Sequence, residues 1–172
     1  MPTQKNKWKE PAVPRTVVQM APVDKNGMVL VMHRGPNVRS IPNVWSFPSG
    51  MHEIGERMEE SLERELREEY DLQAIDCAMV GQYENIAGDL WDQEQYHWVI
   101  SLYVALVEDV KKAVNKEPDK HDRMEFVHYT DLVTPAFWDA HRFHNSFHEE
   151  MREGRHRLAL AAQTLVLKEV IE

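Results

Sequence analysis

The chain has 172 residues, of which 42% are hydrophobic, and these values are typical of one domain with a single core. Acidic residues outnumber basic ones by 29 to 20, so the formal charge of −9 disfavours binding to a long nucleic acid. The single cysteine cannot form an internal disulfide, and no stretch approaches the ~18 apolar residues of a membrane span. We therefore expect a cytoplasmic protein that neither binds duplex nucleic acid nor crosses a membrane.

The N-terminal third begins with a segment that we predict to be a flexible arm, 1–14, because three prolines interrupt regular pairing there. Two apolar runs follow, 15–23 and 28–32, and the first is rich in β-branched residues. This spacing predicts two core strands joined by a hairpin through 24–26. We expect residues 15–172 to form a single domain with a helical C-terminal extension.

A loop with Gly and Pro is predicted at 33–43, followed by a short extended segment that ends at Gly50. Residues 56–70 contain no Gly or Pro, and apolar side chains recur there every four residues. That pattern predicts an amphipathic helix.

Further along the chain, strand and helix signals alternate. Strands are predicted at 74–83, 96–107 and 124–129, and a charged loop at 111–122. From 134 onward helix formers return, and we predict a break at Gly154 ahead of a strong terminal helix. This order favours an α/β fold in which a mixed sheet has helices on either side.

Three glutamates of the predicted 56–70 helix carry the chemistry. Glu65, Glu68 and Glu69 are separated by three and four residues, so they project from one arc of the helix. By helical angle, Glu69 also lies at the edge of the buried face. Carboxylates ~4 Å apart repel each other by about 4 kcal/mol at an effective dielectric of 20, and a divalent cation reverses that sign. Such oxygen ligands suit magnesium or manganese.

The alternative is a solvated acidic helix held by ion pairs at four-residue spacing, Glu60 with Arg64 and Glu63 with Arg67. That alternative does not need the glycine, the glutamate and the Arg-Glu step that stand at fixed spacings in and before the helix. We therefore favour the metal site.

The run from Gly50 to Leu72 resembles the Nudix box. Eight of the nine specified positions match, namely Gly50, Glu56, Arg64, Glu65, Leu66, Glu68, Glu69 and Leu72. Asp71 stands where the pattern has Gly, and Asp is among the few other residues that tolerate the left-handed conformation that closes a helix.

The resemblance implies a Nudix-type α/β/α sandwich and a pyrophosphohydrolase that cuts phosphoanhydride bonds. It implies that water attacks in line at phosphorus while Mg²⁺, or Mn²⁺ as a substitute, offsets the phosphate charge. It also implies that Glu56 pairs with Arg64 and braces the loop against the helix. The implied metal ligands are Glu65, Glu68, Glu69 and the carbonyl of Gly50.

Segments outside the box resemble MutT-like nucleoside triphosphate hydrolases, namely VLVMHRGP, VWSFPSG and NKEPDKHDRMEFVHYTDL. The last of these implies that Glu117 is a further metal ligand or a general base, although a loop that merely connects strands would look similar. We expect a small nucleotide substrate, a nucleoside triphosphate cut to the monophosphate and pyrophosphate. The alternatives are a dinucleotide or nucleotide sugar such as NADH or ADP-ribose, and a non-catalytic nucleotide-binding domain.

Candidate substrate contacts are two arginines of the pre-box loop and two aromatic pairs, namely Arg34, Arg39, Trp45, Phe47, Phe137 and Trp138. Guanidinium groups bind phosphate oxygens, and aromatic faces stack on bases. Core packing is the alternative for both aromatic pairs, and we prefer it for the first pair. A solvated surface position is the alternative for the arginines.

Three histidines, His141, His144 and His148, recur at spacings that also occur in metal sites. No cysteine or well-spaced carboxylate completes such a site, so we favour solvated or stacked histidines. The terminal helix either packs on the domain or contributes to a homodimer interface through an apolar side made of Leu158, Ala162, Leu165 and Leu167.

Overall fold

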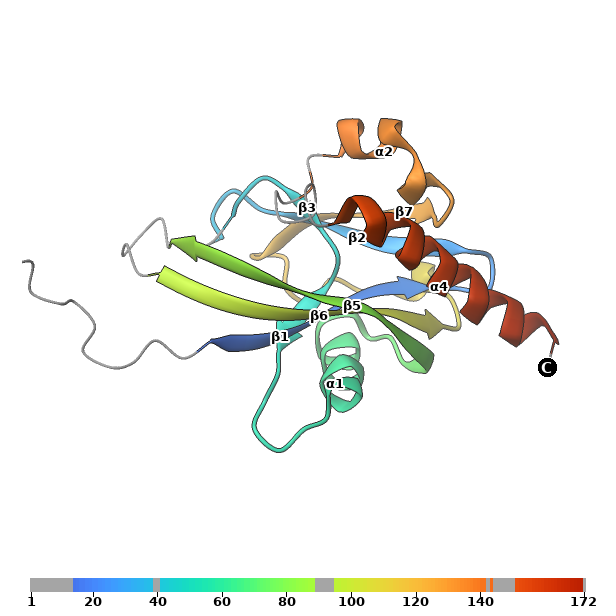
Figure 1. Ribbon diagram of the computed structural model, residues 1–172, viewed down its shortest axis with the longest axis horizontal. Helices are drawn as coiled ribbons and strands as arrows, with labels where there is room; N and C mark the ends of the chain where they lie inside the picture. Colours follow the sequence, from blue (N-terminus) through green and yellow to red (C-terminus); the bar gives the residue numbers. More distant parts are fainter. Residues whose placement is uncertain (1–13, 39–40, 89–94, 142, 144–150, 172) are drawn as a thin grey trace, which may run out of the picture.

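The computed structural model describes residues 14–38, 41–88, 95–141, 143 and 151–171 (Figure 1). Outside this part of the chain lie the first 13 residues of the predicted arm, Arg39, His144 and His148. Their proposed roles stay predictions.

Within the described residues, seven strands form one mixed sheet with the order β3-β2-β1-β6-β5, in which β4 also pairs with β1 and β7 with β2. β1 and β6 are parallel, and the other pairs are antiparallel. The predicted mixed sheet is therefore confirmed. The strands are β1 (Arg15–Val23), β2 (Met28–Arg34), β3 (Trp45–Ser46), β4 (Ser49–Met51), β5 (Ala74–Gly88), β6 (Gln95–Val107) and β7 (His121–His128).

The predicted hairpin between β1 and β2 is present. The amide of Asp24 donates to the carbonyl of Met28 at 3.0 Å, and the Asp24 carboxylate accepts from the amide of Asn26 at 2.8 Å. Gly27 closes the turn with a φ of 76°, a left-handed conformation that glycine adopts without steric cost.

Three strands are longer than the sequence predicts, since β2 reaches Arg34, β5 reaches Gly88 and β7 begins at His121. The last residues of β5 and the first of β6 still pair one to one, as far as Gly88 with Gln95. Backbone hydrogen bonds extend a ladder whatever the side chains are, so a drop in hydrophobicity does not end a strand.

Helix α1 (Met58–Tyr70) covers one face of the sheet and buries Leu62, Leu66 and Tyr70 there. It begins two residues later than predicted, because residue 57 is extended and its amide donates to Glu60 Oε2 at 2.7 Å. Asp71 ends the helix with φ 58° and ψ 30°, the left-handed conformation expected at the position where the box has Gly.

The opposite face is covered by α2 (Pro135–Ala140) and α4 (Met151–Ile171), as Figure 1 shows for α4 lying across β5 and β6. Together with α1 they give the expected sandwich of helices on both sides of the sheet. Short 3₁₀ turns precede and follow β7, at Val110–Lys112 and Asp131–Val133.

The predicted helix break at Gly154 is wrong, because Gly154 lies inside the first turns of α4. A single glycine in a helix costs only about 1 kcal/mol relative to alanine. Burial of Leu158, Ala162 and Leu165 against the sheet outweighs that cost. Leu167 does not belong to this buried side, since it is 51% exposed. The homodimer interface on α4 stays a prediction.

Among the described residues, no helix combines the length and the apolar character that a membrane crossing needs.

Candidate active site

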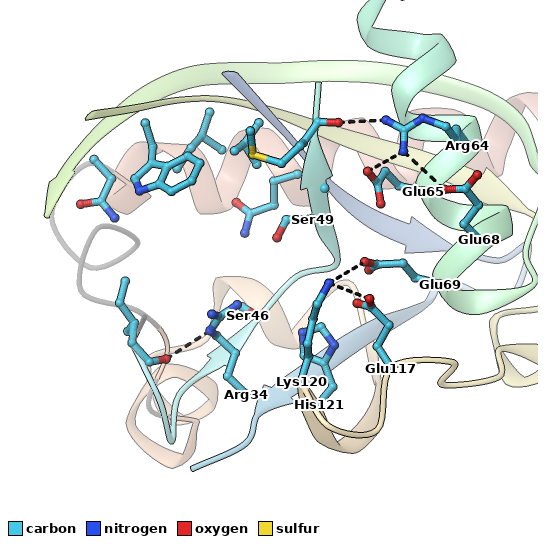
Figure 2. Close-up of a pocket in the computed structure, with 18 of the residues that line it drawn as sticks. Arg34, Ser46, Ser49, Arg64, Glu65, Glu68, Glu69, Glu117, Lys120 and His121 are labelled. Atoms are coloured by element: carbon cyan, nitrogen blue, oxygen red, sulfur yellow. Dashed lines mark hydrogen bonds and ion pairs between the residues drawn. The ribbon is translucent and has the colours of Figure 1, made fainter. Parts of the chain in front are cut away.

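A cleft of about 780 Å³ opens where β1, β4, β5 and β6 meet α1 and the loop ahead of β7 (Figure 2). β1 divides its pairing here, since Val18 pairs with Gly50 of β4 while Val23 pairs with Val29 of β2. The glutamates of α1 and the residues of β4 line this cleft together. Most of the predicted site residues line it, including Gly50, Arg64, Glu65, Glu68, Glu69, Glu117 and Arg34.

Gly50 allows α1 to pack against β4. A Cβ atom at this position would lie 1.9 Å from Cδ of Glu65, a distance that no side chain can accept. Glu65 is therefore held against the strand, and only 7% of it is exposed. The sequence pattern placed these two residues in one site, and the structure explains why the first has to be glycine.

Arg64 organises the acidic side of the cleft. Its Nε and Nη2 donate to the two carboxylate oxygens of Glu56 at 2.7 and 3.0 Å, and Nη2 also reaches the carbonyl of Met51 at 2.9 Å. Nη1 donates to Glu65 Oε1 at 2.7 Å and lies 3.5 Å from Glu68 Oε2. The expected pairing of Glu56 with Arg64 is confirmed, and the loop is braced on the helix as predicted.

These contacts set the charge of the pair. Hydrogen bonds from Arg64 and from the Ser61 hydroxyl lower the pKa of Glu56 to about 2, so this carboxylate stays ionised at any physiological pH. The same contact raises the pKa of Arg64 above its ordinary value. The alternative pairing of Arg64 with Glu60 is not seen, since Glu60 accepts the amide of residue 57.

Glu69 and Glu117 form a second group of carboxylates in the cleft. Glu69 is 8% exposed, which confirms its predicted position at the edge of the buried face of α1. Lys120 Nζ lies 2.6 Å from Glu117 Oε1 and 3.4 Å from Glu69 Oε1. The remaining oxygens, Glu69 Oε2 and Glu117 Oε2, are buried and have no hydrogen-bond partner among the described residues. Burial and the adjacent Glu117 raise the pKa of Glu69 to about 8.

The loop that carries Glu117 is bound to the C-terminal end of α1. The amides of Val114 and Lys116 donate to the carbonyls of Tyr70 and Glu69, both at 2.9 Å. Lys116 Nζ adds an ion pair of 2.7 Å with Asp71. The loop thereby satisfies carbonyls that a helix end leaves without partners.

Asn115 shapes the same loop from within. Its side-chain oxygen accepts the amide of Glu117 at 3.1 Å, and its side-chain nitrogen donates to the carbonyl of His121 at 2.6 Å. Asn115 and Lys116 were not among the site residues predicted from the sequence. An Asn two residues before a functional Glu is the signal that could have identified the turn.

A strip of alternating residues from β1, β6 and β5 forms the other wall of the cleft. Ile100 pairs with Val17 on one side and with Tyr83 on the other, and Trp98 pairs with Asn85. Successive side chains of a strand point to opposite faces, so these residues share one face of the sheet. The wall consists of Val17, Gln19, Tyr83, Asn85, Trp98 and Ile100. None of these residues was predicted from the sequence as a site residue, although the period of two in β6 places Trp98 and Ile100 on one face.

Arg34 borders the cleft on a third side, close to Ile41. Its Nε donates to the carbonyl of Ile41 at 3.1 Å. Ile41 has a φ of 51°, which is rare for a β-branched residue and costs backbone strain. Nearby, burial lowers the pKa of His121 to about 4, so its imidazole is neutral at physiological pH.

The predicted aromatic contacts with substrate are wrong for both pairs. Trp45, Phe47, Phe137 and Trp138 are at most 6% exposed, belong to the core under α4, and do not line the cleft. Core packing, the stated alternative, holds because α2 turns its aromatic residues inward onto Phe143.

The predicted stacking is confirmed for His141. Its ring lies 4.2 Å from that of Phe137, and Nε2 is 3.0 Å from Glu125. In the described part of the chain, no three His, Cys, Asp or Glu side chains converge closely enough to hold a metal ion as they stand.

Comparison with known proteins identifies the family of this chain. The NUDIX domain model matches residues 13–151, more than half of the chain. The MutT protein from Methanosarcina mazei Go1 has a TM-score of 0.64 and 15% identity, over 87% of this chain and 95% of that one. A MutT described from Aliivibrio salmonicida and Vibrio cholerae has a TM-score of 0.60 and 15% identity, over 83% and 97% of the two chains.

The MutT Nudix hydrolase from Burkholderia pseudomallei is 25% identical, with a TM-score of 0.55 over 72% of this chain and 89% of that one. The model match spans every carboxylate described above, from Glu56 to Glu117. The chain belongs to the Nudix family, and it is a MutT-like Nudix pyrophosphohydrolase.

Proposed function

We propose that this pyrophosphohydrolase cuts a nucleoside triphosphate to the monophosphate and pyrophosphate with the help of Mg²⁺. One observation carries the proposal: a single cleft joins a cluster of carboxylates on α1 to a wall of aromatic, amide and aliphatic side chains. The first suits a cation with phosphates, and the second suits a base. A triphosphate nucleotide has both parts.

The residues present fit a divalent cation. Two buried carboxylate oxygens, on Glu69 and Glu117, lack partners among the described residues, and burial of such oxygens is unfavourable unless a proton or a cation offsets their charge. The carboxylates of Glu65 and Glu68 lie on the same edge of α1. The donor set consists of oxygen atoms, which is the preference of Mg²⁺ and Mn²⁺. We propose Glu65, Glu68, Glu69, Glu117 and the carbonyl of Gly50 as the ligands.

A bound divalent cation supplies charge neutralisation of the phosphates and a lowered pKa for a water nucleophile. The chain contributes the placement of the groups around it. Arg64 fixes Glu65 through a 2.7 Å contact and is itself held by Glu56. We propose that Glu117 Oε2, which is buried without a partner among the described residues, binds the cation or accepts the proton of the attacking water. Arg34, on the opposite rim, offers a guanidinium to a phosphate oxygen.

The base is proposed to lie on the wall formed by β1, β5 and β6. Trp98 and Ile100 offer flat apolar surface, and the side chain of Asn85 supplies both a donor and an acceptor. The hydroxyl of Tyr83 donates to the side-chain oxygen of Gln19, which leaves the Gln19 amide group as a donor. An amide donor favours a base that presents a carbonyl oxygen.

The proposal is tested with a panel of canonical, oxidised and methylated nucleoside triphosphates, alongside ADP-ribose and NADH, each with and without Mg²⁺. We expect turnover of one or more triphosphates, with Mg²⁺ required and pyrophosphate released. In water labelled with ¹⁸O, the label in the monophosphate identifies attack at the α-phosphorus. Preferential turnover of ADP-ribose or NADH contradicts the proposal and favours the alternative substrate class.

Two variants show whether the measured hydrolysis belongs to this site. Glu68→Gln and Glu69→Gln keep the size of each side chain and remove its charge. We expect both to fold and to lose orders of magnitude in kcat/KM, because each removes a proposed metal ligand. Full activity in either variant would show that the residue is not a ligand.

A further inference from the structure

Lys120 lies where two carboxylates meet. Its ammonium is 2.6 Å from Glu117 Oε1 and 3.4 Å from Glu69 Oε1, as Figure 2 shows. The carboxylates are largely buried, with side chains 29% and 11% exposed, whereas the Lys120 side chain is 57% exposed and lines the cleft. One cation on a long, exposed side chain therefore contacts both carboxylates from the solvent side.

The contact has an electrostatic cause. Glu69 and Glu117 both contact Lys120, and each keeps one buried oxygen without a hydrogen-bond partner among the described residues. When both carboxylates are ionised they repel each other, and a nearby ammonium reduces the repulsion. Burial tends to lower the pKa of Lys120, but the two carboxylates outweigh that effect and raise it, so its side chain stays charged.

We propose that Lys120 is an internal counter-ion that a divalent cation displaces from Glu69 and Glu117, and that the released ammonium then binds the phosphates of the substrate. This inference rests on the proposed function, because it takes the two glutamates as metal ligands. It adds a link between loading of the metal and binding of phosphate.

The backbone around Lys120 permits this exchange. The amides of Lys120 and His121 both donate to the carbonyl of Glu117, at 2.9 and 3.0 Å, so the turn is held without the lysine side chain. The ammonium sits on four rotatable methylene groups and can leave the carboxylates while the turn stays in place. The cleft lies beside it, so a short movement brings the charge to a bound phosphate.

Lys116, in the same loop, serves as a control for Lys120. It also lines the cleft, but its ammonium pairs with Asp71 at 2.7 Å and contacts the carbonyl of Arg67 at 3.1 Å. It is therefore a lysine of similar exposure that is bound to the end of α1 and does not contact either proposed ligand carboxylate. Loss of its charge changes the electrostatics of the cleft without removing the proposed counter-ion.

The experiment titrates the whole protein calorimetrically with two ligands that do not depend on the base. The first is Mn²⁺ alone, and the second is imidodiphosphate with Mn²⁺ in excess, whose P–N–P bridge resists hydrolysis. Lys120→Met is compared with the unchanged protein, with Lys120→Arg and with Lys116→Met.

We expect Lys120→Met to bind Mn²⁺ roughly tenfold more tightly, because no ammonium competes for Glu69 and Glu117. The same variant should bind imidodiphosphate roughly tenfold more weakly, because a charge-assisted contact is lost. Lys120→Arg restores most of the phosphate affinity. Lys116→Met keeps the Mn²⁺ affinity of the unchanged protein within about twofold, because the Lys116 side chain contacts Asp71 and the carbonyl of Arg67 rather than the ligand carboxylates.

The opposite directions of the two affinity changes are decisive, because a variant that merely damages the loop binds both ligands more weakly. If Lys120→Met binds Mn²⁺ equally or more weakly, Lys120 is not a counter-ion that the metal displaces. If its imidodiphosphate binding is unchanged, Lys120 does not contact the phosphates. A protein that shows both opposite shifts but prefers ADP-ribose over triphosphates upholds Lys120 and contradicts the proposed substrate. If the unchanged protein binds no Mn²⁺, the metal site and the role of Lys120 are both overturned.

Discussion

A Cβ atom on Gly50 would lie 1.9 Å from Cδ of Glu65, so the two residues are complementary in shape. Gly50 is held in place by its pairing with Val18, and α1 is held by its buried apolar face. Neither element can retreat easily. The glycine of the box is therefore required by the close approach of helix and strand, and its φ is not in the left-handed region.

Gly50→Ala should expel the Glu65 side chain from its position. We expect kcat/KM to fall roughly 10- to 100-fold, as for other losses of metal-site geometry, and the free energy of unfolding to fall by about 1–3 kcal/mol. Steady-state kinetics and denaturant titration measure the two effects. Gly81→Ala is the control, because a Cβ there meets no atom within 4 Å. An active Gly50→Ala enzyme would contradict the steric argument.

Glu56→Gln should act through Arg64. Glutamine cannot present two anionic oxygens to the guanidinium, so Arg64 loses its bidentate partner and Glu65 loses its orientation. We expect kcat/KM to fall roughly 10- to 100-fold. The matched control is Glu63→Gln, an exposed position on the same helix, which should retain activity. If both variants behave alike, Glu56 is a surface charge without a positioning role.

Asp71→Gly restores the residue that the box specifies. Glycine relieves the left-handed strain at φ 58° but removes the pair with Lys116 and adds freedom to the unfolded chain. We expect these effects to cancel to within about 1 kcal/mol of unfolding free energy. Asp71→Val should cost about 1–2 kcal/mol or more, because a β-branched residue resists this conformation. Thermal unfolding of both variants checks the order.

The raised pKa of Glu69, about 8, makes stability without metal depend on pH. From pH 6.5 to about 8 the folded chain largely holds this proton, whereas the unfolded chain, with an ordinary pKa of 4.5, does not. Folding therefore takes up a proton, and stability falls as pH rises through the folded pKa. We expect the Tm in a chelating buffer to decrease across this window. Glu69→Gln should flatten the decrease.

His121 affects the pH dependence of stability mainly below this window, because its pKa is lowered to about 4. That residue acts with the opposite sign, because its stabilising effect is lost as pH falls from its ordinary 6.5 toward 4. With saturating Mn²⁺ the decrease above pH 6.5 should shrink or reverse, since metal binding favours the ionised carboxylate. A Tm that rises with pH in the metal-free protein would contradict the Glu69 assignment.

Trp98→Ala tests the proposed base wall. Loss of a stacking surface costs about 1–3 kcal/mol per base, so we expect KM for the preferred nucleotide to rise roughly 5- to 100-fold with a smaller change in kcat. Trp98→Phe keeps an aromatic ring and should lie close to the unchanged protein. A fall in kcat with KM unaltered would place Trp98 outside the base site.

Local pattern alone determined the helix that carries the acidic cluster. The four-residue recurrence of Leu62, Leu66 and Tyr70 predicted its buried face, and the spacing of the glutamates predicted that Glu69 lies at the edge of that face. Both are confirmed. The hairpin was also predictable from local features, because the first run is rich in β-branched residues, which favour strands, and Gly27 favours a turn before the second.

Tertiary structure decided which apolar surface is covered. The aromatic residues at 45, 47, 137 and 138 have the composition of a stacking platform, yet α2 and α4 close over them. Trp98 and Ile100, which read as ordinary strand residues, line the cleft instead. The sequence of one strand or helix does not predict which distant element packs on it.

The acidic cluster thus has two origins. The positions of Glu65, Glu68 and Glu69 along one helix follow from the sequence, because the helical period places them on one arc. The approach of Glu117 and Lys120 depends on a loop some fifty residues further along, which attaches to the carbonyl groups at the end of α1. The carbonyl groups at a helix end are the same in every helix, so no side-chain pattern predicts which loop will bind them.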